Sequence, residues 1–489
     1  MKTITIDPIT RLEGHGKISI FLDDAGNVAD AYLQIPELRG FEKFCVGRPV
    51  EEMPRITTRI CGVCPEAHMM ASAKACDAVY HIELPRTAKL LRELLYMIFF
   101  VTDHATHFYA LGGPDFVMGP DAPKAQRNIL GVIHKVGVEI GRKVVDLRGS
   151  CHELIKKMGG KAVHPIGALP GGMSKGMSRE EKEEIIKAGR NAVEFAKFTI
   201  QLFNDIVLKN PQYVDLILSD SFTHHTYNMG LVDDNNRINF YDGRIRVTGP
   251  DGKELAKFQA AEYLDHIEEH VETWTYLKFP ILKKVGWKGL VEGAGSGIYK
   301  ATPLSRLNVS DGMATPLANE EHDRMYKTLG GKPVHQTLAT HWARIIELLY
   351  AAERWIELVG DPEITGPEFR KVPDRIPDEG VGVVEAPRGT LYHHYKTDRQ
   401  GLITEANLIV GTTNNNGAIN LSVKKAASNF IKDGRVNDGL LNIVEMAFRA
   451  YDPCFGCATH ALPGGPWVSI KIFDHRHRLL RELRSDHGP

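Results

Sequence analysis

Two short motifs near opposite ends of the chain each contain two cysteines separated by two residues. Cys61 and Cys64 form the first pair, and Cys454 and Cys457 form the second. A Cys-x-x-Cys pair directs two thiolates from one turn at a single ion, so two pairs can supply four sulfur ligands to one metal site. We therefore expect the two ends of the chain to meet around a metal centre.

Four thiolates do not select the metal by themselves. Thiolates are soft ligands, and they suit structural zinc, rubredoxin-like iron, iron–sulfur clusters and nickel. The cysteines alone therefore leave zinc, iron and nickel open, and the residues around them have to decide.

The residues around both pairs resemble the signatures of the large subunit of nickel-iron hydrogenases. Matching segments run through the whole chain: Arg11-Leu-Glu-Gly-His15, Arg39-Gly-Phe-Glu42, Arg59-Ile-Cys-Gly-Val-Cys64 with His68, Asp103-His-Ala-Thr-His107, Glu385-Ala-Pro-Arg-Gly389, and Asp452-Pro-Cys-Phe-Gly-Cys457 with His460. The resemblance implies that Cys61 and Cys454 bind nickel terminally. It implies that Cys64 and Cys457 bridge nickel to an iron that carries carbon monoxide and cyanide. The implied reaction is reversible, heterolytic cleavage of dihydrogen into protons and electrons.

The same resemblance assigns roles to residues outside the cysteine pairs. Glu13 would exchange protons with Cys454, because a partly buried carboxyl has a raised pKa and can exchange protons near neutral pH. Arg388 would hold its charged guanidinium over the open metal position. Asp103 and Asp452 would orient that guanidinium.

Three further residues are expected close to the metals. His68 would donate a hydrogen bond to the sulfur of Cys64, which is a common way to orient and tune a metal ligand. Pro387 and Thr412 match positions that border the diatomic ligands of iron. Thr412 lies in Gly-Thr-Thr, where better-known members of the family have Pro-Ser-Thr.

A second metal and a processing step are also implied by the resemblance. Glu42, the main-chain carbonyl of Leu408 and His460 match a six-coordinate magnesium site completed by water. In this family an endopeptidase cuts after the matching histidine. We therefore expect residues 1–460 to form one interlocked domain and residues 461–489 to be a maturation tail.

Composition limits the class of protein. The chain has 489 residues, a formal net charge of −1 and 43% hydrophobic residues, so it can bury a large core and shows no global basic charge for binding nucleic acid. The longest strongly apolar run, Leu94 to Val101, is too short to span a bilayer, and the start of the chain shows no signal region. Seven cysteines fit a reducing compartment, so a cytoplasmic location is expected, with Cys45, Cys76 and Cys151 as buried thiols.

Periodicity predicts a mainly helical fold with small sheets added to it. Helical patterns predict a central bundle of long helices, and alternating patterns predict an N-terminal hairpin and peripheral sheets. The helices are expected at 84–111, 123–158, 179–209 and 337–360, the hairpin at 3–35, the sheets within 235–330 and 380–413, and a surface loop at 361–380.

The chain has no further cysteine pairs for iron–sulfur clusters, so electrons are expected to leave through an iron–sulfur small subunit. The chain looks most like the cytoplasmic methyl-viologen-reducing, deazaflavin-non-reducing hydrogenases, which implies a flavin or heterodisulfide reductase-type complex as a further partner. Two alternatives remain at this point. One is a structural zinc protein, and the other is a non-catalytic respiratory-complex subunit that shares the fold, although such subunits lose the cysteine pairs that this chain keeps.

Overall fold

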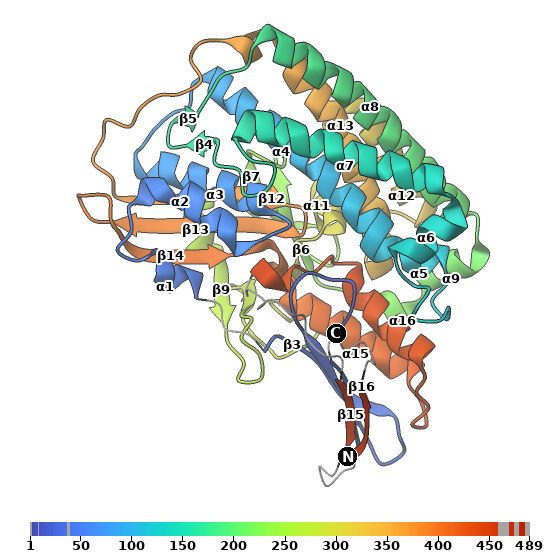
Figure 1. The fold of residues 1–489 in the computed structure, drawn as a ribbon. Coiled ribbons are helices and arrows are strands. Elements are labelled where there is room, and N and C mark those ends of the chain that lie inside the picture. The colour runs from blue at the N-terminus through green and yellow to red at the C-terminus, as the bar shows by residue number, and fades with distance from the viewer. Residues whose placement is uncertain (1, 8, 37–39, 458–468, 474–478, 485–489) are drawn as a thin grey trace.

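Four long helices pack together as a bundle. The computed structural model describes residues 2–7, 9–36, 40–457, 469–473 and 479–484. The long helices are α4 (Arg86–Thr106), α7 (Val138–Gly159), α8 (Arg179–Phe203) and α13 (Thr340–Gly360). Helix α13 packs against α4 and α8, and α4 packs against α7 (Figure 1). The prediction of a mainly helical fold around a bundle is confirmed.

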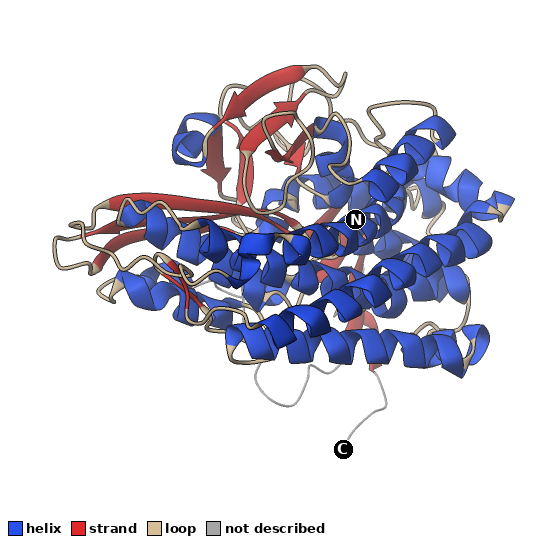
Figure 2. Cartoon of the chain, turned by 90° about the horizontal axis from the view of Figure 1, so that it is seen from above, coloured by secondary structure: helices blue, strands red, loops and turns tan. Residues whose placement is uncertain are grey.

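The other helices are shorter, and Figure 2 shows the helices and strands of the chain from above. The shorter helices are α1 (Phe41–Cys45), α2 (Met53–Ile56), α3 (Pro65–Val79), α5 (Gly113–Val117), α6 (Ile129–Val136), α9 (Pro211–Leu218), α10 (Tyr263–His266), α11 (Pro303–Val309), α12 (Pro316–Thr328), α14 (Gly411–Asn414), α15 (Asn416–Phe430) and α16 (Asp438–Arg449). Within the described residues, no helix combines the length and apolar character needed to cross a membrane.

One helix prediction is wrong. The pattern over 123–158 predicts a single helix, but the structure contains α6 and α7 with Gly137 between them. Gly137 has a φ of 100°, a left-handed conformation that ends a helix and that side chains other than glycine rarely adopt. The side chain of Asn128 caps α6 by accepting a hydrogen bond from the backbone N–H of Gly131. The apolar periodicity of the sequence thus continues from α6 into α7, and only Gly137 marks the break between the two helices.

The N-terminal segment forms three strands of a five-stranded antiparallel sheet, which is more than the predicted hairpin. The strands are β1 (Lys2–Ile6), β2 (Lys17–Leu22), β3 (Val28–Gln34), β15 (Ser469–Phe473) and β16 (Leu479–Arg484), in the order β16-β15-β1-β2-β3. Strand β15 pairs with β1, so a segment near the C-terminus lies beside the N-terminus (Figure 1). The connection from β1 to β2 contains Glu13.

A second sheet brings the segment 379–409 across α3. Strands β12 (Glu379–Ala386), β13 (Gly389–Thr397) and β14 (Ile403–Ile409) form an antiparallel meander. Helix α3 packs on β12 and β13. A β-carbon at Gly382 would overlap the backbone of Ala71 and Ala75, and one at Gly380 would overlap the backbone of Val79. Glycine at these two strand positions therefore permits the close approach of α3.

The remaining sheets are small. The order β11-β6-β7-β8 joins β6 (Tyr227–Val232), β7 (Arg244–Thr248), β8 (Glu254–Phe258) and β11 (Tyr299–Lys300), while β9 (Ile267–His270) pairs with β10 (Phe279–Leu282) and β4 (Ala168–Leu169) with β5 (Gly172–Met173). Most of these strands lie in the predicted range 235–330, whereas β4, β5 and the fully buried β6 lie outside the predicted ranges. The three cysteines predicted to be core thiols, Cys45, Cys76 and Cys151, are buried and form no disulfide among the described residues.

The packing of α3 on β12 yields a stability prediction. Gly382→Ala is expected to lower the free energy of unfolding by about 1–3 kcal/mol, because the new methyl group has to displace helix backbone. The matched control is Gly149→Ala, on an exposed turn of α7 with no atom within 4 Å of the new β-carbon. Removing a mid-helix glycine should raise stability by about 0.5–1 kcal/mol. Thermal unfolding measures both, and an unchanged midpoint for Gly382→Ala would contradict the close approach.

Candidate metal centre

The four cysteines of the two motifs meet in the interior. Cys61 and Cys64 have sulfur atoms 2.9 Å apart, and those of Cys454 and Cys457 are also 2.9 Å apart. Across the motifs, the sulfurs of Cys61 and Cys454 lie 3.3 Å apart and those of Cys64 and Cys457 lie 3.4 Å apart. All four residues are buried, and their ligand atoms lie within 4.8 Å of one another. The ends of the chain therefore converge as the two motifs predict.

Local backbone geometry aims these sulfurs at one point. The backbone N–H groups of Val63 and Cys64 donate to the sulfur of Cys61, at 3.3 and 3.0 Å. Cys64 is the N-cap of α3, and Pro65 occupies the first helical position, where its missing N–H is not needed. In the second motif, the backbone N–H of Cys454 donates to the hydroxyl of Thr412 at 3.0 Å. Turns thus hold both pairs before any metal binds.

The four cysteines differ in the direction in which the pKa of each thiol is shifted. Burial raises the pKa of Cys61, but hydrogen bonds from the other three cysteines outweigh it and hold that pKa well below its ordinary value. Burial raises the pKa of Cys454 strongly and that of Cys457 to about 11. Burial therefore opposes the charged form of these sulfurs, whereas a metal binds the thiolate and would compensate that cost.

Glu13 lies directly against the second cysteine pair. Its carboxylate accepts hydrogen bonds from the thiol of Cys454 at 3.1 Å and from the backbone N–H of Gly456 at 2.6 Å. The backbones of Glu13 and Cys454 also form a parallel β-bridge. Burial, followed by the charge of Cys61, raises the pKa of Glu13. A half-buried carboxyl in this position can exchange a proton with the sulfur next to it.

Two glycines make this contact possible. Gly14 has a φ of 87°, and a β-carbon there would collide with the backbone of Phe455 and Gly456. A β-carbon on Gly456 would collide with the carboxylate of Glu13. Glycine in both the Leu-Glu-Gly and the Cys-Phe-Gly segments thus allows these two segments to pack closely against each other.

Arg388 lies between two buried aspartates. Its Nη1 donates to Asp103 at 3.0 Å, and its Nη2 forms an ion pair with Asp452 at 2.9 Å. Burial disfavours the charged guanidinium, but the two carboxylates outweigh this and keep the pKa of Arg388 well above its ordinary value. Cys454 and Cys64 also raise the pKa of Arg388, which indicates that its guanidinium lies near both residues. The structure therefore brings Arg388, Asp103 and Asp452 together beside the cysteines.

A buried arginine holds the turn that carries Arg388. Arg306 on α11 forms a bidentate ion pair with Glu347, at 2.6 and 2.7 Å, and a 3.0 Å ion pair with Glu385. Its guanidinium also donates hydrogen bonds to the backbone carbonyls of Ala386 and Pro387. Removing one partner of such a network leaves an unpaired buried charge, which costs about 3–5 kcal/mol. The turn between β12 and β13 is therefore firmly fixed.

The structure describes His68 and Glu42, two of the other predicted site residues, but not His460. His68 is buried on α3, where its Nδ1 contacts Nε2 of His393 at 3.1 Å. Glu42 is half-buried on α1, which packs against β14, the strand that contains Leu408. His460, the third predicted magnesium ligand, lies outside the described residues, and the magnesium site stays a prediction.

Sequence reasoning missed three buried polar residues near the centre. Glu66 follows Cys64 and Pro65 on α3, where burial raises its pKa to about 8. A glutamate in a first helical turn is usually read as a residue that favours the helix dipole, so only its place inside the cysteine motif could have marked it. His393 and Tyr395 on β13 were missed because an alternating strand pattern does not show which face meets α3.

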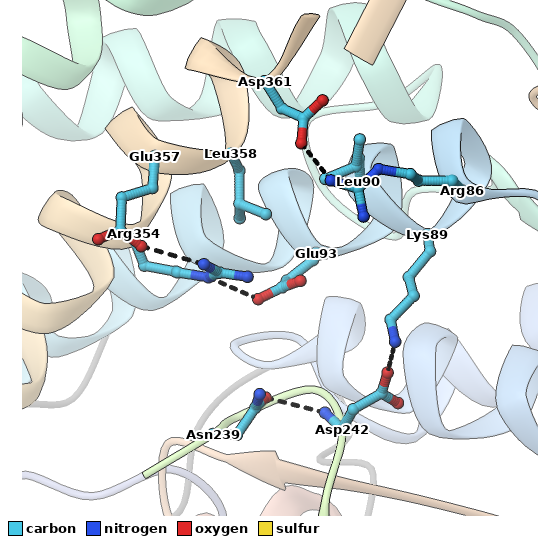
Figure 3. A pocket seen from close by; sticks show the side chains of 10 residues that line it. All are labelled: Arg86, Lys89, Leu90, Glu93, Asn239, Asp242, Arg354, Glu357, Leu358 and Asp361. Carbon is cyan, nitrogen blue, oxygen red and sulfur yellow. Dashed lines mark hydrogen bonds and ion pairs between the residues drawn. The ribbon is translucent and has the colours of Figure 1, made fainter. Parts of the chain in front are cut away.

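A separate pocket of about 270 Å³ lies between α4, α13 and the turn before β7 (Figure 3). Its charged groups pair with one another: Arg354 with Glu93 and Glu357, Arg86 with Asp361, and Lys89 with Asp242. None of the predicted site residues lines it. The chemistry therefore belongs to the cysteine cluster and not to this pocket.

Comparison with known families supports the resemblance. Residues 39–137 and 295–460 match the family described as nickel-dependent hydrogenase. Residues 3–38 match a family described as HoxL-like. Together these matches include both cysteine pairs and the segment that carries Glu13.

Individual relatives match over nearly the full chain. A protein of Archaeoglobus profundus that is named as an F420-non-reducing hydrogenase iron-sulfur subunit is 47% identical, with 99% of this chain and 100% of that protein covered. The beta subunit of the NAD-reducing hydrogenase HoxS of Cupriavidus necator is 39% identical, with 98% and 99% covered. A crystal structure of an NAD⁺-reducing [NiFe]-hydrogenase in the H2-reduced state superposes with a TM-score of 0.88 at 37% identity, covering 94% of this chain and 100% of that chain.

Proposed function

The chain belongs to the nickel-dependent hydrogenase family and is a catalytic large subunit with a four-cysteine cluster, and from this premise we propose that it cleaves dihydrogen reversibly into protons and electrons. One observation carries the proposal: a carboxyl group contacts one sulfur of the cluster while a fixed cation lies beside it. Heterolytic cleavage requires both a base for the proton and positive charge near the reacting molecule.

The donor set fits nickel and iron. Cys61 and Cys454 would bind nickel, and Cys64 and Cys457 would bridge it to an iron with carbon monoxide and cyanide ligands. Soft thiolates suit both metals. When bound, the metal pair supplies the Lewis acidity that polarises dihydrogen.

The residues of the chain supply the remaining chemistry. Glu13 accepts the proton released at the Cys454 sulfur and passes it away from the cluster, a role supported by the 3.1 Å contact between them. Arg388 places its charge at the open side of the centre, and Asp103 and Asp452 fix its direction. Pro387 on the Arg388 turn would border the diatomic ligands of iron.

His68 and Thr412 complete the surroundings of the centre. His68 would hydrogen-bond to the bridging sulfur of Cys64. The hydroxyl of Thr412 would border the iron ligands while it holds the backbone of Cys454. A structural zinc site is disfavoured because it needs neither a buried arginine nor a carboxyl on a ligand sulfur.

The identity of the metals is tested by elemental analysis and infrared spectroscopy on the purified complex. One nickel per chain is expected, with iron in excess of nickel because the iron–sulfur small subunit adds iron, together with infrared bands from metal-bound carbon monoxide and cyanide. The same analysis measures magnesium, which we propose is bound by Glu42, the carbonyl of Leu408 and His460. Zinc alone, without those bands, would contradict the proposed centre.

The role of Glu13 is tested with Glu13→Gln. The amide still accepts the hydrogen bond from Gly456 but cannot carry a proton, so the exchange of D2 with water should fall by about 10²-fold or more while nickel and iron stay bound. Because this assay needs no electron exit, it isolates proton movement. Glu13→Asp keeps a titratable carboxyl and should retain more exchange. Full exchange in the amide variant would remove Glu13 from the proton route.

We propose that residues 1–460 form one domain, supported by a buried core that contains residues from Cys45 to Cys457. Residues 461–489 are a tail that a maturation endopeptidase removes after His460. Only 469–473 and 479–484 of this tail are described, as β15 and β16. The intact mass of active protein is expected to end at His460, and a tail still attached in active protein would refute its removal.

Electrons have to leave through a partner. Gly62 and Val63 are exposed immediately beside Cys61, so the cluster lies one loop away from the surface. We propose that an iron–sulfur small subunit docks over this loop in the cytoplasm, and that a flavin or heterodisulfide reductase-type complex receives the electrons. The relatives named as non-reducing toward F420 support this assignment. Co-purification of an iron–sulfur protein with the tagged chain tests it.

A further inference from the structure

A chain of buried hydrogen-bonding contacts leads from the first cysteine motif into the β12–β14 sheet. Nδ1 of His68 lies 3.1 Å from Nε2 of His393, and Nδ1 of His393 lies 2.6 Å from the hydroxyl of Tyr395. That hydroxyl lies 3.0 Å from Oγ of Ser72. All four side chains are fully buried, so water does not compete for these contacts. The orientations of the four side chains are therefore coupled.

Regular geometry explains why these residues meet. His68 and Ser72 are one helical turn apart and share a face of α3. His393 and Tyr395 are two residues apart and share a face of β13. Their register partners on β12 are the two glycines that admit the backbone of α3. The face of the sheet that carries the histidine and the tyrosine is thus the face against which α3 packs.

His68 connects this chain to the cysteines. It lies four residues after Cys64, which caps the start of the same helix. Because Nδ1 is directed at His393, a hydrogen bond from His68 to a sulfur has to use Nε2. The proton on Nε2 is present only in one tautomer of the neutral ring.

The chain permits two arrangements of its protons. In the first, Tyr395 donates to Nδ1 of His393, Nε2 of His393 donates to Nδ1 of His68, and His68 keeps its proton on Nε2. In the second, every donor is reversed, and Nε2 of His68 carries a lone pair instead of a proton. Burial and nearby thiols raise the pKa of Tyr395 well above its ordinary value, so the tyrosine keeps the proton that it donates. Thiolates favour the first arrangement, because an N–H attracts them and a lone pair repels them.

We propose that His393 and Tyr395 are positioning residues that, together with Ser72, fix the tautomer and ring direction of His68 so that it presents an N–H to the bridging thiolate of Cys64. The proposal rests on the proposed nickel–iron centre. A hydrogen bond to a bridging thiolate withdraws electron density from the iron. The chain would thus set the electron density of the metal pair from a strand that contributes no ligand.

The test is the infrared spectrum of the assembled complex. Tyr395→Phe removes the hydroxyl that donates to His393, so His68 should lose its fixed tautomer and the bridging thiolate should give more density to iron. The carbon monoxide and cyanide bands are expected to shift to lower frequency with nickel and iron content unchanged. Tyr392→Phe is the matched control, since this buried tyrosine is on the same strand and its hydroxyl contacts the sulfur of Met229 at 3.5 Å.

The outcomes separate the two proposals. Absence of the bands in the unmodified protein would refute the nickel–iron centre itself. Bands that are present but unshifted in Tyr395→Phe, or shifted equally in Tyr392→Phe, would overturn the positioning role. If the Tyr395→Phe complex does not assemble, Ser72→Ala is the second test, because it removes only the hydroxyl oxygen at the end of this series of hydrogen-bonding contacts. A smaller shift in the same direction supports the proposal, and no shift overturns it.

Discussion

The structure depends on keeping several ionisable groups together where water does not reach them. Burying a charge costs several kcal/mol unless a partner compensates it. Here the guanidinium of Arg388 lies between Asp103 and Asp452, and the four cysteine sulfurs share hydrogen bonds. Each compensation requires a residue from a different part of the chain. The long-range connections of the fold are therefore a consequence of the charges at its centre.

A second set of buried ion pairs supports the turn that carries Arg388. Arg306, Glu347 and Glu385 are completely buried, and the arginine also binds the carbonyls that lead into Arg388. The helix α13, which contributes Glu347, is the same helix that packs against α4, which contributes Asp103. The packing of these two helices therefore positions Asp103 beside Arg388 and Glu347 beside Arg306.

The sequence predicts local features better than pairings. The two cysteine pairs follow from spacing, and the long helices predicted within 84–111, 179–209 and 337–360 follow from period and are confirmed. The pairing of Arg306 with two glutamates does not follow, because each residue alone looks like an ordinary surface charge. The break at Gly137 was missed for a related reason: the apolar period continues across it, and only the left-handed backbone separates the helices. The ion pairs of Arg306 join residues far apart in the chain, whereas the break between α6 and α7 is marked locally by Gly137 alone.

The position of Glu13 shows how the two ends of the chain depend on each other. Strand β1 leads into the connection that contains Glu13, and β1 pairs on its other side with β15 from the C-terminal region. The register aligns Thr3 with Phe473 and Ile4 with Ile472. If the tail is removed, β1 becomes an edge strand, while the contact between Glu13 and Cys454 remains as a connection from this sheet to the cysteines. That contact depends on Gly14 and Gly456, which both lie outside the tail, so the contact that holds Glu13 against the sulfur involves no residue of the tail.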